Sequence, residues 1–89
     1  LPLEDAAAMR KTGYDSLTDS EAGVASNWRN PKTGNSGSFT PETAYLTDDG
    51  ILCRNYTATL TVRGETEQIR QTACRTGIGS WTPVADASS

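Results

Sequence analysis

The residues of this chain whose type and spacing point most directly to chemistry are its two cysteines. Cys53 and Cys74 are accompanied by no histidine anywhere in the 89 residues. Two separated thiols without histidine make a poor zinc site, and no Cys-x-x-Cys pair is present for redox exchange. We therefore predict a structural disulfide, which is typical of exported proteins and rare in cytosolic ones.

Groups suited to catalysis are scarce in the sequence. The lack of histidine excludes Ser-His-Asp and Cys-His mechanisms and removes the imidazole ligands of most metal sites. Asp48 and Asp49 form an adjacent carboxylate pair, but beside Gly50 they are better explained as turn residues. No segment resembles a calcium-binding or phosphate-binding loop. We expect a protein that is not an enzyme and that uses no metal and no cofactor.

A long β-hairpin is predicted to bring the two cysteines together. Its strands run from Leu52 to Val62 and from Glu65 to Ala73, and both are rich in threonine and other strand-forming residues. If the two-residue turn is Arg63-Gly64, Cys53 lies directly opposite Cys74. This is a non-hydrogen-bonded pair, where the two Cα atoms approach most closely and a bridge is feasible. The turn and the cysteines are independent features, so their agreement supports both.

The same register gives the hairpin one apolar face and one polar face, as in an antiparallel sheet that is packed on one side. The residues of the apolar face are Leu52, Tyr56, Ala58, Leu60, Val62, Ile69 and Ala73. The cysteines lie on the opposite face, which is rich in threonine and is predicted to be solvated.

Helices are predicted before the hairpin. One runs from Leu3 to Met9, with acidic residues in its first turn, and stops at Gly13. A second begins at the capping box Thr18-Asp-Ser-Glu21 and ends before Pro31. Its apolar side would cover the apolar face of the hairpin; the residues concerned are Leu17, Val24 and Trp28.

Short strands are predicted around the hairpin, from Ser38 to Thr40, from Thr43 to Leu46 and from Trp81 to Val84. The fold class is therefore α+β: helices packed on one face of an antiparallel β-meander of four or five strands, held by one disulfide. We divide this single domain into a helical segment over 1–30, a disulfide-bonded β region over 31–84 and a flexible tail over 85–89.

Arg54 and Arg75 are predicted to leave the sheet on its apolar face, where each needs a partner. We favour an arrangement in which their stems pack at the sheet edge while their guanidinium groups meet acidic side chains. The candidate carboxylates are those of Asp48, Asp49 and Glu42. The alternative is a site for an anion or for a ligand carboxylate.

Aromatic residues offer a second source of binding surface. Trp28 is expected in the core, whereas Trp81 and Tyr45 are candidates for either core or recognition. The loop that starts at Asn30 is a further contact surface. The predicted partner-binding residues are Arg54, Arg75, Trp81, Tyr45 and Asn30.

Charge excludes some classes of partner. The net charge is −3, and no cluster of lysine and arginine is present, so nucleic-acid binding is not expected. No apolar stretch is long enough to cross a bilayer, and neither a signal peptide nor a lipid-attachment cysteine occurs in the sequence. Export is therefore inferred from the disulfide.

Three short motifs resemble a known family. They are Trp28-Arg-Asn-Pro-Lys-Thr-Gly34, Cys53-Arg-Asn-Tyr56 and Ala73-Cys-Arg75 followed by Gly79-Ser-Trp81. Their order and spacing resemble the C-terminal domain of the rickettsial-type 17-kDa surface-antigen lipoproteins of Gram-negative bacteria, although Asn55 replaces a usual acidic residue. The resemblance implies an envelope location and no enzymatic activity. The lipid-bearing cysteine and glycine-zipper segment of that family are missing, so membrane anchoring is not carried over.

We expect an exported protein of the periplasm, outer membrane or cell surface that binds an envelope protein or serves as an accessory subunit of a membrane-protein complex. The alternative function is inhibition of a hydrolase such as a lysozyme or a protease. Small disulfide-bonded β domains can inhibit by inserting a loop into a cleft, and the candidate loops are Asn30 to Ser38 and Thr76 to Ser80.

Overall fold

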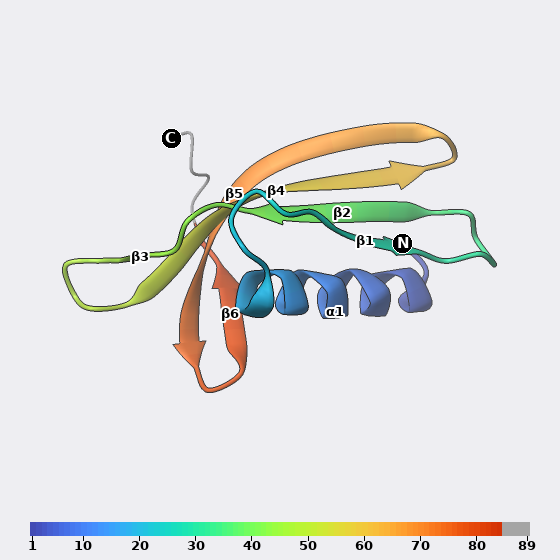
Figure 1. Ribbon diagram of the computed structural model, residues 1–89. Coiled ribbons are helices and arrows are strands. Elements are labelled where there is room, and N and C mark those ends of the chain that lie inside the picture. Colours follow the sequence, from blue (N-terminus) through green and yellow to red (C-terminus); the bar gives the residue numbers. More distant parts are fainter. Residues whose placement is uncertain (85–89) are drawn as a thin grey trace.

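The computed structural model describes residues 1–84, in which one helix packs on a sheet of six strands (Figure 1). The elements are α1 (Leu3–Asp19), β1 (Ser26–Arg29), β2 (Ser36–Pro41), β3 (Tyr45–Leu46), β4 (Leu52–Val62), β5 (Glu65–Gly77) and β6 (Ser80–Pro83). All pairs are antiparallel in the order β1-β2-β4-β5-β6, and β3 also pairs with β4. The predicted α+β class is confirmed, but with six strands among these residues instead of four or five. The tail predicted over 85–89 lies outside the described residues.

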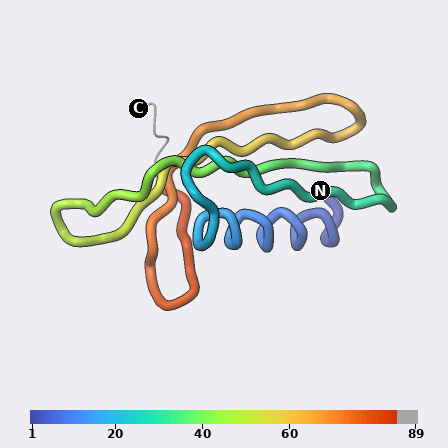
Figure 2. The backbone as a smooth tube through the Cα atoms, in the orientation of Figure 1, coloured from blue at the N-terminus to red at the C-terminus, as the bar shows by residue number. Residues whose placement is uncertain are grey.

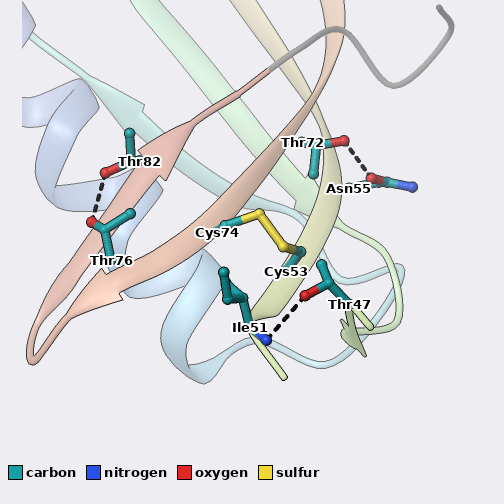
Figure 3. Close-up of a disulfide and its surroundings, with 8 residues drawn as sticks. All are labelled: Thr47, Ile51, Cys53, Asn55, Thr72, Cys74, Thr76 and Thr82. Carbon is teal, nitrogen blue, oxygen red and sulfur yellow. Dashed lines mark hydrogen bonds between the residues drawn. A yellow bond between two sulfur atoms is a disulfide. The ribbon is translucent and has the colours of Figure 1, made fainter. Parts of the chain in front are cut away.

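The central hairpin of β4 and β5 has the register that the sequence predicts. Val62 lies opposite Glu65, and Cys53 lies opposite Cys74. The Arg63-Gly64 turn has φ angles of 54° and 79°, as a type I′ hairpin loop requires. The two cysteine sulfurs are bonded at 2.04 Å (Figure 3). The predicted disulfide is confirmed.

α1 is longer than the first predicted helix, which was expected to run from Leu3 to Met9. It passes through Gly13, which was expected to stop it, and continues to Asp19. Gly13 instead allows close packing, because a Cβ at this position would lie 3.0 Å from Cζ of Phe39 on β2. Thr18, the expected N-cap of the second helix, lies inside the last turn of α1.

The predicted second helix is wrong, because residues 26–29 form a strand that pairs with β2. Trp28 is buried there over Gly37, where a Cβ would come within 2.5 Å of the indole Nε1. Val24, expected to cover the sheet, is 51% exposed. Strand pairing and burial of a tryptophan outweigh a capping motif that is worth about 1 kcal/mol. The helical segment predicted over 1–30 is correspondingly shorter.

The core lies between the C-terminal half of α1 and the middle of the sheet. Leu17, Tyr56 and Ala73 are buried against one another, and the partly buried side chains around them are those of Phe39, Ala58 and Trp81. α1 packs mainly on β1 and β2, as Figure 1 shows. The same face of β4 and β5 has no second helix over it within residues 1–84.

The face that carries the disulfide is not solvated around the bridge, contrary to the prediction. Cys53 is only 1% exposed. Tyr45 on β3 lies opposite Cys53, and Thr82 on β6 lies opposite Cys74. Because opposed residues of an antiparallel pair share a face, these two side chains flank the bridge on either side. Figure 3 shows the β6 side, where the hydroxyls of Thr76 and Thr82 are 2.7 Å apart.

Candidate functional site

Arg54 is buried at the C-terminal end of α1 and does not meet a carboxylate. Its Nε donates to the backbone carbonyl of Glu42, and its Nη1 donates to the carbonyls of Leu17 and Ser20, all at 2.9 Å. The last carbonyls of a helix lack partners within the helix and carry partial negative charge. The guanidinium group therefore joins the end of α1 to the sheet. The predicted pairing of Arg54 with an acidic side chain is wrong.

Arg75 and Trp81 lie opposite each other on β5 and β6. The guanidinium carbon of Arg75 is 5.4 Å from the centre of the Trp81 ring, which is a cation–π contact. The indole Nε1 donates to Oγ1 of Thr18 at 3.1 Å and so attaches the β5–β6 hairpin to α1. Glu42, a predicted partner of the two arginines, instead forms an ion pair with Arg70, and the hydrogen bond from Arg70 lowers the pKa of its carboxyl.

Asn30 is buried at the opposite end of α1, in a polar cluster that was not predicted. Asp5 is fully buried, and its carboxylate accepts from the side-chain amides of Asn30 and Asn35, both at 2.7 Å. The hydroxyl of Thr33 donates to the same carboxylate at 3.0 Å. The loop between β1 and β2 is thereby held on the first turn of α1.

The protonation of Asp5 follows from this cluster. Burial of the carboxyl acts to raise its pKa, but the hydrogen bonds from Asn35, Asn30 and Thr33 favour the charged form, and the net result is a lowered pKa. The carboxylate is charged near neutral pH and is fully occupied by three neutral donors. It therefore supports the fold and is not available to a ligand.

The five predicted contact residues do not form one surface. Arg54 and Asn30 lie at opposite ends of α1, about 18 Å apart along the helix axis at 1.5 Å per residue from Asp5 to Leu17. Tyr45 is 42% exposed but lies on the disulfide face of the sheet. Only Arg75 and Trp81 are brought together, near a groove.

The groove lies between α1, the sheet and the β5–β6 hairpin, and it has a volume of about 600 Å³. Its floor is made by Tyr56, Ala58, Ile69 and Gln71, while α1 forms one wall and Trp81 closes one end. Most of these side chains are apolar, and Ile69 is 50% exposed. The hydroxyl of Tyr56 donates to Oε1 of Gln71 at 3.0 Å, and burial raises the pKa of this phenol.

A second hollow of about 790 Å³ continues the same face toward the hairpin turn, between Leu60, Val62, Glu65 and Glu67 and the start of α1. In the β4–β5 register, these residues and those of the groove floor occupy every second position of their strands, so they all lie on one face of the sheet. We call this face the β4–β5 strip. It consists of Tyr56, Ala58, Leu60 and Val62 on β4 and Glu65, Glu67, Ile69 and Gln71 on β5.

Sequence reasoning missed both the Asp5 cluster and the groove. A signal for the cluster was present, because Asn30 and Thr33 belong to the tryptophan-containing motif and carry side chains that can hold a carboxylate. The groove could not be predicted, since the second helix was expected to cover it. Within residues 1–84, no three potential ligand residues cluster in a way that could hold a metal ion, and no helix has the length and apolar character to cross a membrane.

Comparison with known proteins gives consistent results. The model of a family described as 17 kDa outer membrane surface antigen matches residues 15–82. A 17 kDa surface antigen of Rickettsia bellii is 40% identical over 73 residues, which are 82% of this chain and 46% of that protein. The 17 kDa surface antigen of Rickettsia prowazekii is 33% identical over 81 residues, which are 91% of this chain and 51% of that protein. No solved structure matches.

The chain spans about half the length of the curated relatives that it matches. The matched region contains the disulfide, Trp81 and the whole β4–β5 strip, whereas most of the α1 wall of the groove precedes it. The family description agrees with the exported, envelope location that the disulfide predicts. The chain belongs to the family of 17 kDa outer membrane surface antigens.

Proposed function

We propose that this domain is a non-enzymatic binding module of the bacterial envelope and that it holds another envelope component on the β4–β5 strip. The observation that carries the proposal is the open apolar groove of about 600 Å³ beside the core. A contiguous apolar surface of this kind on a small domain is typical of an interaction site. Family membership and the disulfide support the envelope location.

The predicted contact residues take different parts in this proposal. Trp81 forms the end wall of the groove, and Arg75 stacks on its ring. Arg54 and Asn30 are buried and act on binding only by holding α1 and the β1–β2 loop in place. Tyr45 lies outside the proposed contact.

Affinity capture from envelope extract would test the proposal. The domain is immobilised in parallel with an Ile69→Glu variant, which places a charge on the groove floor without disturbing the core, because Ile69 is half exposed. We expect one or more envelope proteins to be retained by the original domain across a range of salt concentrations and to be lost from the variant. Equal retention by the two proteins, or no retention by either, would contradict the proposal.

Inhibition of a hydrolase is the second candidate function, favoured by one observation. Ile78 is fully exposed at the tip of the β5–β6 hairpin, which projects from the sheet (Figure 2). The other candidate loop is exposed over residues 31–34, but its two ends are tied to Asp5 by Asn30 and Asn35. A panel of lysozymes and proteases assayed with excess domain should reveal a target whose inhibition disappears with Ile78→Ser. Unchanged rates throughout would exclude this function for the panel.

A further inference from the structure

The width of the β4–β5 strip matches one α-helix. Neighbouring strands are about 4.8 Å apart and a helix with its side chains is about 10 Å across, so one helix covers about two strands. α1 packs mainly on β1 and β2 and reaches β4 and β5 only near Tyr56 and Ala73, so that Ile69 is left half exposed. The position beside α1, where the sequence led us to expect a second helix, has none within residues 1–84.

The charges along the strip differ from end to end. The part near Trp81 is apolar, and Arg10 on α1 borders it. The part near the hairpin turn carries Glu65 and Glu67, both exposed and neither in an ion pair among the described residues. Arg63 of the turn lines the same hollow, so the carboxylates outnumber the cation there by two to one. A complementary ligand therefore needs an apolar surface with positive charge at one end and negative charge near Arg10.

We infer that the β4–β5 strip binds an amphipathic α-helix of a partner protein. This inference rests on the proposed function and names the binding element. The apolar side of the helix lies on Ala58, Leu60 and Ile69, parallel to α1, and lysine or arginine at one end of the helix faces Glu65 and Glu67. A helix fills a face two strands wide, whereas an extended peptide pairs with a sheet edge and would leave the groove floor bare.

Two other occupants fit the charges less well. An anionic membrane surface would be repelled by Glu65 and Glu67. A second copy of this chain, with the two strips facing each other about a two-fold axis, would place these glutamates either against the same glutamates of its neighbour or against the apolar end that Arg10 borders. Desolvating two carboxylates with at most one cation between them is unfavourable.

Site-specific photo-crosslinking in cells of the source bacterium tests the inference on the full chain. The photoreactive residue p-benzoylphenylalanine replaces Ile69 in the strip, Gln68 on the opposite face of β5 as a matched control, or Ile78 at the hairpin tip. We expect crosslinks at position 69 and not at 68, to a segment of another protein with an apolar stripe and basic residues at one end. Mass spectrometry of the crosslinked peptide identifies the segment.

The captured segment is then synthesised and titrated against the domain. We expect its circular dichroism to gain helical signal on binding. Ile69→Glu should weaken binding by at least about tenfold, and Glu65→Lys with Glu67→Lys by about threefold or more, while Gln68→Lys changes it little. All these positions are exposed, so the variants are expected to fold.

Any of the following outcomes of these experiments would overturn the inference. A segment that binds without gaining helix would be a strand ligand, a crosslink to the chain's own sequence would indicate self-association or an internal segment, and a crosslink to lipid would indicate a membrane contact. Crosslinks to protein at position 78 but not at 69 would reject both the helix site and the strip as the binding surface. No crosslink to protein at any position would also reject the binding function.

Discussion

Replacing Arg54 by methionine tests whether one buried side chain holds α1 to the sheet. Methionine keeps an apolar stem of similar length but removes the donors to three backbone carbonyls, at 2.9 Å each, of Glu42, Leu17 and Ser20. Arg54 is only 7% exposed, so water cannot readily replace the lost bonds. Two of the carbonyls lie at the C-terminal end of α1, where a positive charge is favourable.

The expected loss can be worked out from these contacts. A hydrogen bond to a charged group contributes about 1.5–3 kcal/mol, and the favourable charge at the helix end adds about 0.3–1 kcal/mol. Because the helix end can shift and recover some solvation, we expect a net loss of about 3–5 kcal/mol in the free energy of unfolding. For a domain of this size, such a loss lowers the melting temperature by roughly 15–30 °C.

The measurement is urea unfolding followed by circular dichroism and tryptophan fluorescence. Arg29→Met is the matched control, because Arg29 is exposed and its loss should change stability by no more than about 0.5 kcal/mol. Arg54→Lys should lose an intermediate amount of stability, since a single ammonium group cannot reproduce the planar fork of donors. A loss below about 1 kcal/mol for Arg54→Met, or one equal to the control, would refute the role assigned to this residue.

Three further changes have defined expected outcomes. Replacing Cys53 and Cys74 by alanine opens a crosslink with a sequence separation of 21 residues and should cost about 3 kcal/mol in urea unfolding. Asp5→Asn should lower stability at neutral pH. Because the folded pKa of Asp5 lies below the ordinary value of an aspartate, the stability advantage of aspartate over asparagine should be constant above about pH 5 and shrink as the pH falls below about 4. Gly37→Ala places a Cβ 2.5 Å from Nε1 of Trp28 and should cost about 1–3 kcal/mol, with a change in tryptophan fluorescence.

Each of these changes has its own control. Reducing agent should destabilise the original domain but not the cysteine-free variant. A stability difference between Asp5→Asn and the original domain that does not vary between pH 2 and pH 7 would contradict the lowered pKa. Gly77→Ala is the control for Gly37→Ala, because nothing lies within 4 Å of its added Cβ; equal stabilities of the two variants would show that Trp28 does not pack closely on β2.

The part of the fold that could be predicted is the part that local rules specify. A two-residue hairpin turn needs positive φ angles, which Gly64 adopts readily, and such a turn sets the register of both strands. That register alone places Cys53 opposite Cys74 and sorts the side chains onto two faces. The disulfide, and the export that is inferred from it, can therefore be predicted without any tertiary information.

The prediction of a second helix is wrong because it rests on a local capping motif, whereas contacts with a distant strand determine the structure of this segment. A capping box near Thr18 favours a helix start by about 1 kcal/mol. Pairing of residues 26–29 with β2 satisfies backbone groups and buries Trp28 over Gly37, and neither contact is visible in the sequence near Trp28. The groove exists only because this segment became an edge strand.

The partners of buried polar groups were likewise decided by tertiary structure. The register correctly places Arg54 on the apolar face. Only the path of α1 shows that its guanidinium group donates hydrogen bonds to backbone carbonyls and not to carboxylates. Asp5 lies in the first turn of α1, and its three neutral partners come from a loop at least 25 residues away in the chain. The amino-acid sequence by itself therefore determined the central hairpin, its bridge and its two faces, because these depend on alternation and turn geometry. The packing of α1 decided the rest, including the open strip, because contacts between distant segments determine which faces are covered.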